Sequence, residues 1–129
     1  MAVLVYTESE KGKFKKSAFE LVSYAREIAN KTNSSVTAIS INTDESNLLS
    51  KYGADKVLNV IDTNLESFNA QLYSSVINQA ALKESSKIII IGSSANSKYL
   101  APLLAIKLDA GYVSNVIEIP IYHNDAWST

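Results

Sequence analysis

Cysteine is absent from this sequence of 129 residues, which excludes disulfide bonds, thiol catalysis and metal sites built on cysteine. Only one histidine, His123, is present, so a Ser-His pair would have a single candidate base and a metal site a single histidine ligand. The lack of cysteine fits a reducing compartment. We expect a cytoplasmic protein without a signal or transit peptide, because the apolar residues after Met1 extend only to Tyr6.

Glycine and arginine are also scarce. The four glycines, Gly12, Gly53, Gly92 and Gly111, are never paired, so the chain has no G-x-G-x-x-G or Walker phosphate loop. Arg26 is the only arginine, and 12 basic against 13 acidic side chains give a net charge of −1. This balance gives no sign of a nucleic-acid partner. No apolar run approaches a membrane span, so we expect no membrane insertion.

The chain does contain a series of short apolar runs separated by amphipathic segments. Ile88–Ile91 has no polar position, which is typical of a strand covered on both faces in a parallel sheet, and Val3–Tyr6 has the same character. Strands are predicted at 3–6, 36–41, 56–61, 88–91 and 112–119, and helices at 17–31, 46–52 and 68–84, with a last helix that ends before Ala110. Because of Pro102, that last helix either starts late, near Tyr99, or has an open first turn. This alternation predicts an α/β three-layer sandwich around a central, mainly parallel five-stranded sheet.

Local signals set the expected boundaries. Residues 7–16 are predicted as a polar connection, and Ser17 with Glu20 predicts a capping box at the start of the first helix. Gly53 is placed to end the short helix at 46–52. We expect residues 1–120 to form one domain and residues 121–129, which show no clear pattern, to be an irregular tail.

The candidate site residues are Gly92, Ser93 and Ser94, which follow the strand at 88–91. Ligands of parallel α/β sheets bind where strands end, but these residues also suit a simple strand-to-helix turn. A nucleophile elbow needs G-x-S-x-G, and the second glycine is missing. The residues alone therefore predict no catalytic or metal-binding residues. They predict an α/β domain that binds a ligand at its strand ends, or another protein, without catalysis.

Three ordered motifs carry a resemblance to a known family. They are Ser94–Ala105 with its L-A-P, continued by A-G-Y-V-S-N-V within 108–116; Tyr52–Val57, which reads Y-G-A-D-K-V; and the opening Val3–Glu8. Over residues 2 to about 119 the sequence resembles the amino-terminal domain of the electron transfer flavoprotein α subunit. One departure is Leu103, which stands where the family often has an arginine after L-A-P, although a basic residue is kept at Lys98.

The resemblance implies an electron carrier subunit rather than an enzyme. It implies an adenine-nucleotide α-hydrolase-like fold with strand order 3-2-1-4-5, numbered along the chain. The α subunit pairs with a β subunit and passes electrons from acyl-CoA dehydrogenases to a membrane quinone reductase. Most FAD contacts belong to a carboxyl-terminal domain that would follow the tail at 121–129, so we expect FAD in the full-length protein and none in this chain.

Two further expectations concern what this domain contacts. Phe14, Tyr99 and the aromatic residues of the tail, Tyr122 and Trp127, look under-used by the core pattern. We therefore expect the β subunit, or a second copy of this chain in its absence, to meet the last helix and the strands beyond it. The alternative is a stand-alone adenine-nucleotide-binding domain of the universal-stress-protein type, which shares the architecture. That family needs a second glycine-rich phosphate stretch near its last helix, which Gly92 alone does not supply.

Overall fold

The structure is a computed structural model that describes residues 2–86, 88–92, 96, 99–100, 102–104, 112–115, 121–123 and 126–128. At residues 112–115, 121–123 and 126–128 it describes the backbone only. The account that follows is confined to these parts of the chain.

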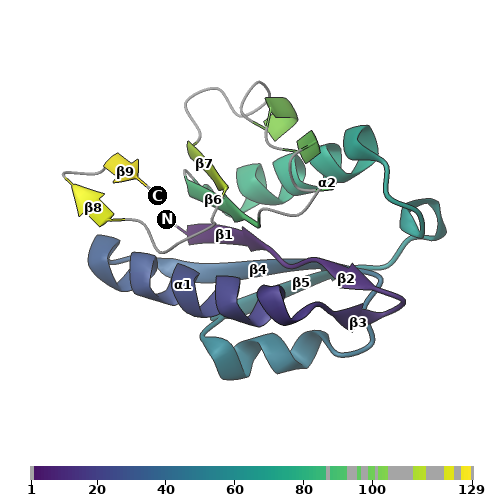
Figure 1. The fold of residues 1–129 in the computed structure, drawn as a ribbon, viewed down its shortest axis with the longest axis horizontal. Coiled ribbons are helices and arrows are strands. Elements are labelled where there is room, and N and C mark those ends of the chain that lie inside the picture. The colour runs from purple at the N-terminus through teal and green to yellow at the C-terminus, as the bar shows by residue number, and fades with distance from the viewer. Residues whose placement is uncertain are drawn as a thin grey trace.

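Within the described residues, a five-stranded parallel sheet forms the centre of the domain (Figure 1). Its strands are β1 (Ala2–Tyr6), β4 (Ser35–Ile41), β5 (Lys56–Val60), β6 (Ile88–Ile91) and β7 (Tyr112–Asn115). Their order is β5-β4-β1-β6-β7, which confirms the predicted 3-2-1-4-5 arrangement. Val3 pairs with Val36 on one side and Ile88 on the other, so the two unbroken apolar runs are adjacent central strands, as expected.

Helices cover both faces of the sheet, which confirms the three-layer sandwich (Figure 1). Because successive side chains of a strand point to opposite faces, Val3 and Val5 pack with α1 (Lys16–Thr32) while Leu4 packs with α2 (Ala70–Lys83). The predicted apolar face of the first helix is buried in full: Ala18, Leu21, Val22, Ala25, Ile28 and Ala29. Leu100 and Leu104, from the last predicted helix, are fully buried beside α2.

Residues 7–16 are more structured than a polar connection. They form a hairpin of β2 (Ser9–Glu10) and β3 (Lys13–Phe14), and Phe14 packs against the α1 side of the core rather than remaining under-used. The predicted capping box is wrong, because α1 begins at Lys16 and its N-cap is Lys15, without a side-chain cap. The hairpin fixes this helix start instead, through a backbone bond from Lys15 N to Glu8 O (3.2 Å).

Three other features differ from expectation. The short helix η1 (Ser46–Tyr52) has the predicted bounds but is a 3-10 helix, and a 3-10 turn that was not predicted, η2 (Thr63–Leu65), precedes α2. Helix α2 begins at Ala70 rather than residue 68, because Asn69 caps it by accepting a hydrogen bond from the Leu72 amide (3.0 Å).

The stretch 121–129 was expected to be irregular. That expectation is wrong for β8 (Ile121–His123) and β9 (Ala126–Ser128), which pair antiparallel, so hydrogen bonding between two short segments gives order that neither shows alone. The domain boundary at residue 120 stays a prediction. Among the described helices, none is long and apolar enough to cross a membrane.

Arg26 joins three segments near the starts of β4 and β5. Its guanidinium donates to the carbonyl oxygens of Gly53 and Ser34, both at 3.3 Å, and pairs with Asp55 Oδ2 at 2.8 Å. Asp55 Oδ2 also accepts from the Val36 amide at 2.8 Å. That backbone hydrogen bond first, and then Arg26, lower the pKa of Asp55. The Y-G-A-D-K-V motif therefore connects α1 to the starts of β4 and β5, at the edge of the sheet opposite the carboxyl ends of its strands.

Candidate functional site

Of the three predicted site residues, the structure describes Gly92, while Ser93 and Ser94 lie outside the described residues. Gly92 directly follows β6 and is half-buried. A Cβ atom added there would meet Leu21 Cδ1 at 3.4 Å, an ordinary van der Waals contact, so the packing of the described residues does not require glycine at this position. Gly92 is not among the residues that line the cleft described next.

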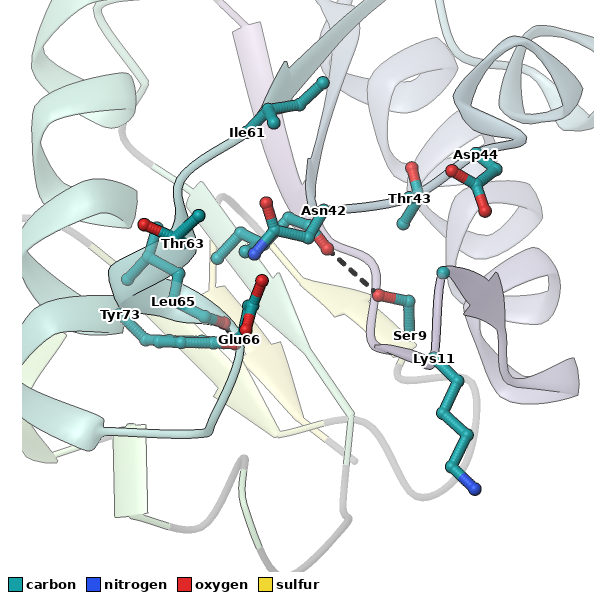
Figure 2. A pocket seen from close by; sticks show the side chains of 12 residues that line it. Ser9, Lys11, Asn42, Thr43, Asp44, Ile61, Thr63, Leu65, Glu66 and Tyr73 are labelled. Atoms are coloured by element: carbon teal, nitrogen blue, oxygen red, sulfur yellow. Dashed lines mark hydrogen bonds between the residues drawn. The ribbon is translucent and has the colours of Figure 1, made fainter.

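A cleft of about 410 Å³ lies instead at the carboxyl ends of β4 and β5, beside the hairpin β2–β3 (Figure 2). In Figure 1 the hairpin and the start of α2 lie beyond the carboxyl end of β1. The cleft is lined by Ser9, Lys11, Gly12, Ile41, Asn42, Thr43, Asp44, Ile61, Thr63, Leu65, Glu66 and Tyr73. These residues come from three segments, 9–12, 41–44 and 61–66, and from α2. We call this the edge cleft.

The hairpin wall of the edge cleft is fastened to the end of β4. Ser9 Oγ donates to the Ile41 carbonyl at 3.1 Å, and the Asp44 amide donates to the Gly12 carbonyl at 3.0 Å. Gly12 has φ +82°, and a Cβ atom there would stand 2.6 Å from Asp44 Oδ2. Only glycine therefore allows the hairpin to approach Asp44 this closely.

Asn42 lies between the two walls and joins β4 to β5. Its φ of 52° is in the left-handed region, which asparagine tolerates better than most residues. Asn42 Nδ2 donates to the Asp62 carbonyl at 2.9 Å, and the Asp62 amide donates to Asn42 Oδ1 at 2.8 Å. Both halves of the side-chain amide are thus used to hold the strand ends together.

A small polar network holds Thr43, one of the residues that line the edge cleft. Ser40 Oγ donates to Asn59 Oδ1 at 2.9 Å, Thr43 Oγ1 contacts the same oxygen at 3.1 Å, and Asn59 Nδ2 donates to the Thr43 carbonyl at 3.1 Å. Ser40 and Thr43 are buried, and networks whose members are paired rigidify their surroundings. The network therefore fixes the position of Thr43 in the lining.

The second wall is held by Tyr73 of α2. Its hydroxyl donates to the Leu65 carbonyl, and its ring meets Tyr6 edge-on at a centroid distance of 6.4 Å and Phe68 at 5.0 Å. Burial raises the pKa of Tyr73 above its usual value. Asp62 caps η2 by accepting from the Asn64 amide at 2.9 Å. Tyr73 is thus a neutral, fixed support.

Beside the edge cleft, a buried carboxylate ties β1 to the hairpin. Glu8 Oε2 pairs with Lys15 Nζ at 2.8 Å, and its side chain is only 9% exposed. The hydrogen bond to Glu8 raises the pKa of Lys15. Burial first, and then the Glu8 charge, raise the pKa of Tyr6.

The chemistry available here is recognition by hydrogen bonds, charge and apolar contact. Among the described residues, no group of three or more His, Cys, Asp or Glu side chains could hold a metal ion. The hydroxyl groups of Ser9 and Thr43 already contact acceptors of the protein itself. Sequence reasoning missed this site, although the polar residues that end the strand at 36–41 were a signal that could have pointed to it.

The fold and the edge cleft define a parallel α/β domain with an open cleft at the carboxyl ends of its strands. A family profile described as "Electron transfer flavoprotein domain" matches residues 3–127. The chain is 30% identical over 122 residues to the electron transfer flavoprotein subunit alpha of Bacillus subtilis (strain 168), which covers 92% of this chain and 37% of that protein.

Two further relatives agree. The acryloyl-CoA reductase electron transfer subunit beta of Anaerotignum propionicum is 26% identical over 125 residues, 95% of this chain and 34% of that protein. Protein FixB of Clostridium saccharobutylicum is 25% identical over 131 residues, 98% of this chain and 39% of that protein. The chain belongs to the electron transfer flavoprotein domain family, which confirms the resemblance carried by its motifs. It spans less than two fifths of the length of these three relatives.

Proposed function

We propose that this chain is the amino-terminal scaffold domain of an electron transfer flavoprotein α subunit. The complete subunit would pair with a β subunit in a heterodimeric FAD carrier that passes electrons from acyl-CoA dehydrogenases to a quinone reductase, as fatty acid β-oxidation requires. The family match over residues 3–127 carries this proposal. The strand order supports it, because it is the order that the resemblance implies.

The lining of the edge cleft is a poor match for a flavin dinucleotide, which supports this assignment. Its pyrophosphate needs backbone amides at a helix N-terminus, close glycines or fixed cations. The edge cleft instead presents the exposed carboxylates of Asp44 and Glu66, and the side chain of Lys11 leads away from the other lining side chains (Figure 2). Arg26 is engaged with Gly53 and Asp55. We therefore assign this domain a packing role and the FAD contacts to the remainder of the subunit.

Flavin retention tests this assignment. The purified chain is expected to be colourless, and its visible absorbance should be unchanged after FAD addition and desalting. Stoichiometric retained flavin would overturn the scaffold role. The same preparation tests the universal-stress-protein alternative, because a rise in melting temperature with ATP or AMP would favour a nucleotide-binding domain.

The β-subunit partner is tested through the last predicted helix. Tyr99 is 66% exposed, as expected for a residue that meets a partner, and aromatic residues are common anchors of interfaces. Light scattering should show a 1:1 complex with the β subunit, and Tyr99→Asp should weaken it by about tenfold. Leu82→Asp is the matched control, because Leu82 is 68% exposed on α2. No association of the unaltered chain at about 50 μM would count against the proposal.

A further inference from the structure

Two carboxylates of the edge cleft lack an ionic partner. Among the described residues, Asp44 and Glu66 form no ion pair, whereas the carboxylates that do are Glu8, Glu45, Asp55 and Glu84. Lys11 also lines the cleft, but Figure 2 shows its side chain leading away from the others. The charge that the cleft itself presents is therefore negative.

An apolar rim accompanies this charge. Ile61 is 78% exposed, the most exposed large apolar side chain in the described part of the protein. Ile41 and Leu65, which also line the cleft, are each 4% exposed and form the buried apolar part of its lining. Covering Ile61 would remove apolar surface from water, which stabilises a complex at about 25 cal/mol per Å².

The walls are also fixed before anything binds. Ser9 is hydrogen-bonded to β4, Asn42 makes two hydrogen bonds with the backbone of Asp62, and Tyr73 is hydrogen-bonded to the Leu65 carbonyl. Figure 2 shows the hairpin wall and the η2 wall on either side of Asn42. A preformed site avoids much of the entropy cost of ordering loops on binding.

The geometry points to the edge cleft as a docking site for an arginine side chain, flanked by apolar residues, of a partner protein. Arginine matches the features because its guanidinium donates charge-assisted hydrogen bonds to carboxylates. The aliphatic part of the arginine side chain and the apolar residues next to it in the partner would lie on Ile61, Ile41 and Leu65. A volume of about 410 Å³ is within the usual range for pockets of small ligands, and it accommodates one such side chain with part of its neighbours. Anionic occupants are disfavoured by Asp44 and Glu66.

A pair of peptides tests this on the chain itself, with no β subunit or flavin present. The probes are acetyl-Leu-Arg-Leu-amide and acetyl-Leu-citrulline-Leu-amide, which have the same shape but differ in charge. Nuclear magnetic resonance titration should move the amide signals of residues 9–12, 41–44 and 61–66. The arginine peptide should bind at least about fivefold more tightly, and added salt should reduce that difference.

Variants then separate charge from packing. Asp44→Asn and Glu66→Gln should each reduce the preference for the arginine peptide, while Ile61→Ser should weaken both peptides alike. Glu20→Gln, an exposed carboxylate on α1, is the matched control and should change nothing. Equal affinity for the two peptides, shifts confined to other segments, or no saturation would each overturn the inference. These outcomes leave the scaffold proposal untouched, because that proposal is tested by flavin retention and the β subunit.

Discussion

Replacing Gly53 by alanine should destabilise this domain by more than an ordinary surface substitution. Gly53 ends η1 with φ +120°, a backbone conformation that residues with a Cβ atom rarely adopt. A Cβ atom added there would stand 2.9 Å from Arg26 Cβ and 3.1 Å from Arg26 Cγ. Carbon atoms do not approach that closely, and the position of Arg26 Cβ is fixed by the helix backbone, so the turn must shift relative to α1.

The magnitude has two parts. Backbone strain of a non-glycine residue at such a φ costs about 1–3 kcal/mol. The shift of the turn weakens the hydrogen bonds of Arg26 to the carbonyl oxygens of Gly53 and Ser34 and its pair with Asp55, which is screened because the Arg26 side chain is 29% exposed. That loss contributes about 1 kcal/mol. We expect a total of about 2–4 kcal/mol.

Urea unfolding followed by circular dichroism measures this free energy. Gly92→Ala is the matched control, because its added Cβ meets, among the described residues, only Leu21 at an ordinary distance of 3.4 Å, and it should cost less than about 1 kcal/mol. Arg26→Ala keeps the Cβ atom at 2.9 Å but removes Cγ and the hydrogen-bonding guanidinium. The double variant Arg26→Ala/Gly53→Ala loses the Arg26 hydrogen bonds only once, so it should be less destabilised than the two single losses combined. A Gly53→Ala protein within about 0.5 kcal/mol of the unaltered chain would refute the reasoning.

Three other outcomes are expected. Ile89→Ala, at a fully buried position, should lower the free energy of unfolding by about 2–5 kcal/mol in the same assay. Asn42→Ala should cost about 1–3 kcal/mol, because it loses both bonds to the Asp62 backbone and must adopt φ 52°; a loss below about 0.5 kcal/mol would contradict this. The pKa of Asp55 is lowered chiefly by the Val36 amide, so its contribution to stability is present above about pH 4 and is lost as the pH falls through the folded-state pKa. Asp55→Asn should therefore weaken the fall in the free energy of unfolding at acid pH. An unchanged fall would show that Asp55 does not contribute to it.

The central layers of the domain could be predicted from the sequence, because a strand that is buried on both faces has no polar positions. Ile88–Ile91 and Val3–Tyr6 have no polar position, and such runs are stable only inside a covered parallel sheet. The helical spacing of apolar residues likewise predicted the buried face of α1. The order of the strands followed from the family resemblance rather than from periodicity.

The edge cleft was decided by tertiary structure alone. Its lining comes from segments around residues 9–12, 41–44 and 61–66, which are brought together only when β1, β4 and β5 pair. The capping box predicted at Ser17 is wrong for the same reason. The β2–β3 hairpin, which is hydrogen-bonded to β4, sets the start of α1 instead. These contacts outweigh a capping preference of about 1 kcal/mol. Apolar periodicity thus determined which residues are buried, while hydrogen bonds between distant strand ends determined where polar groups meet.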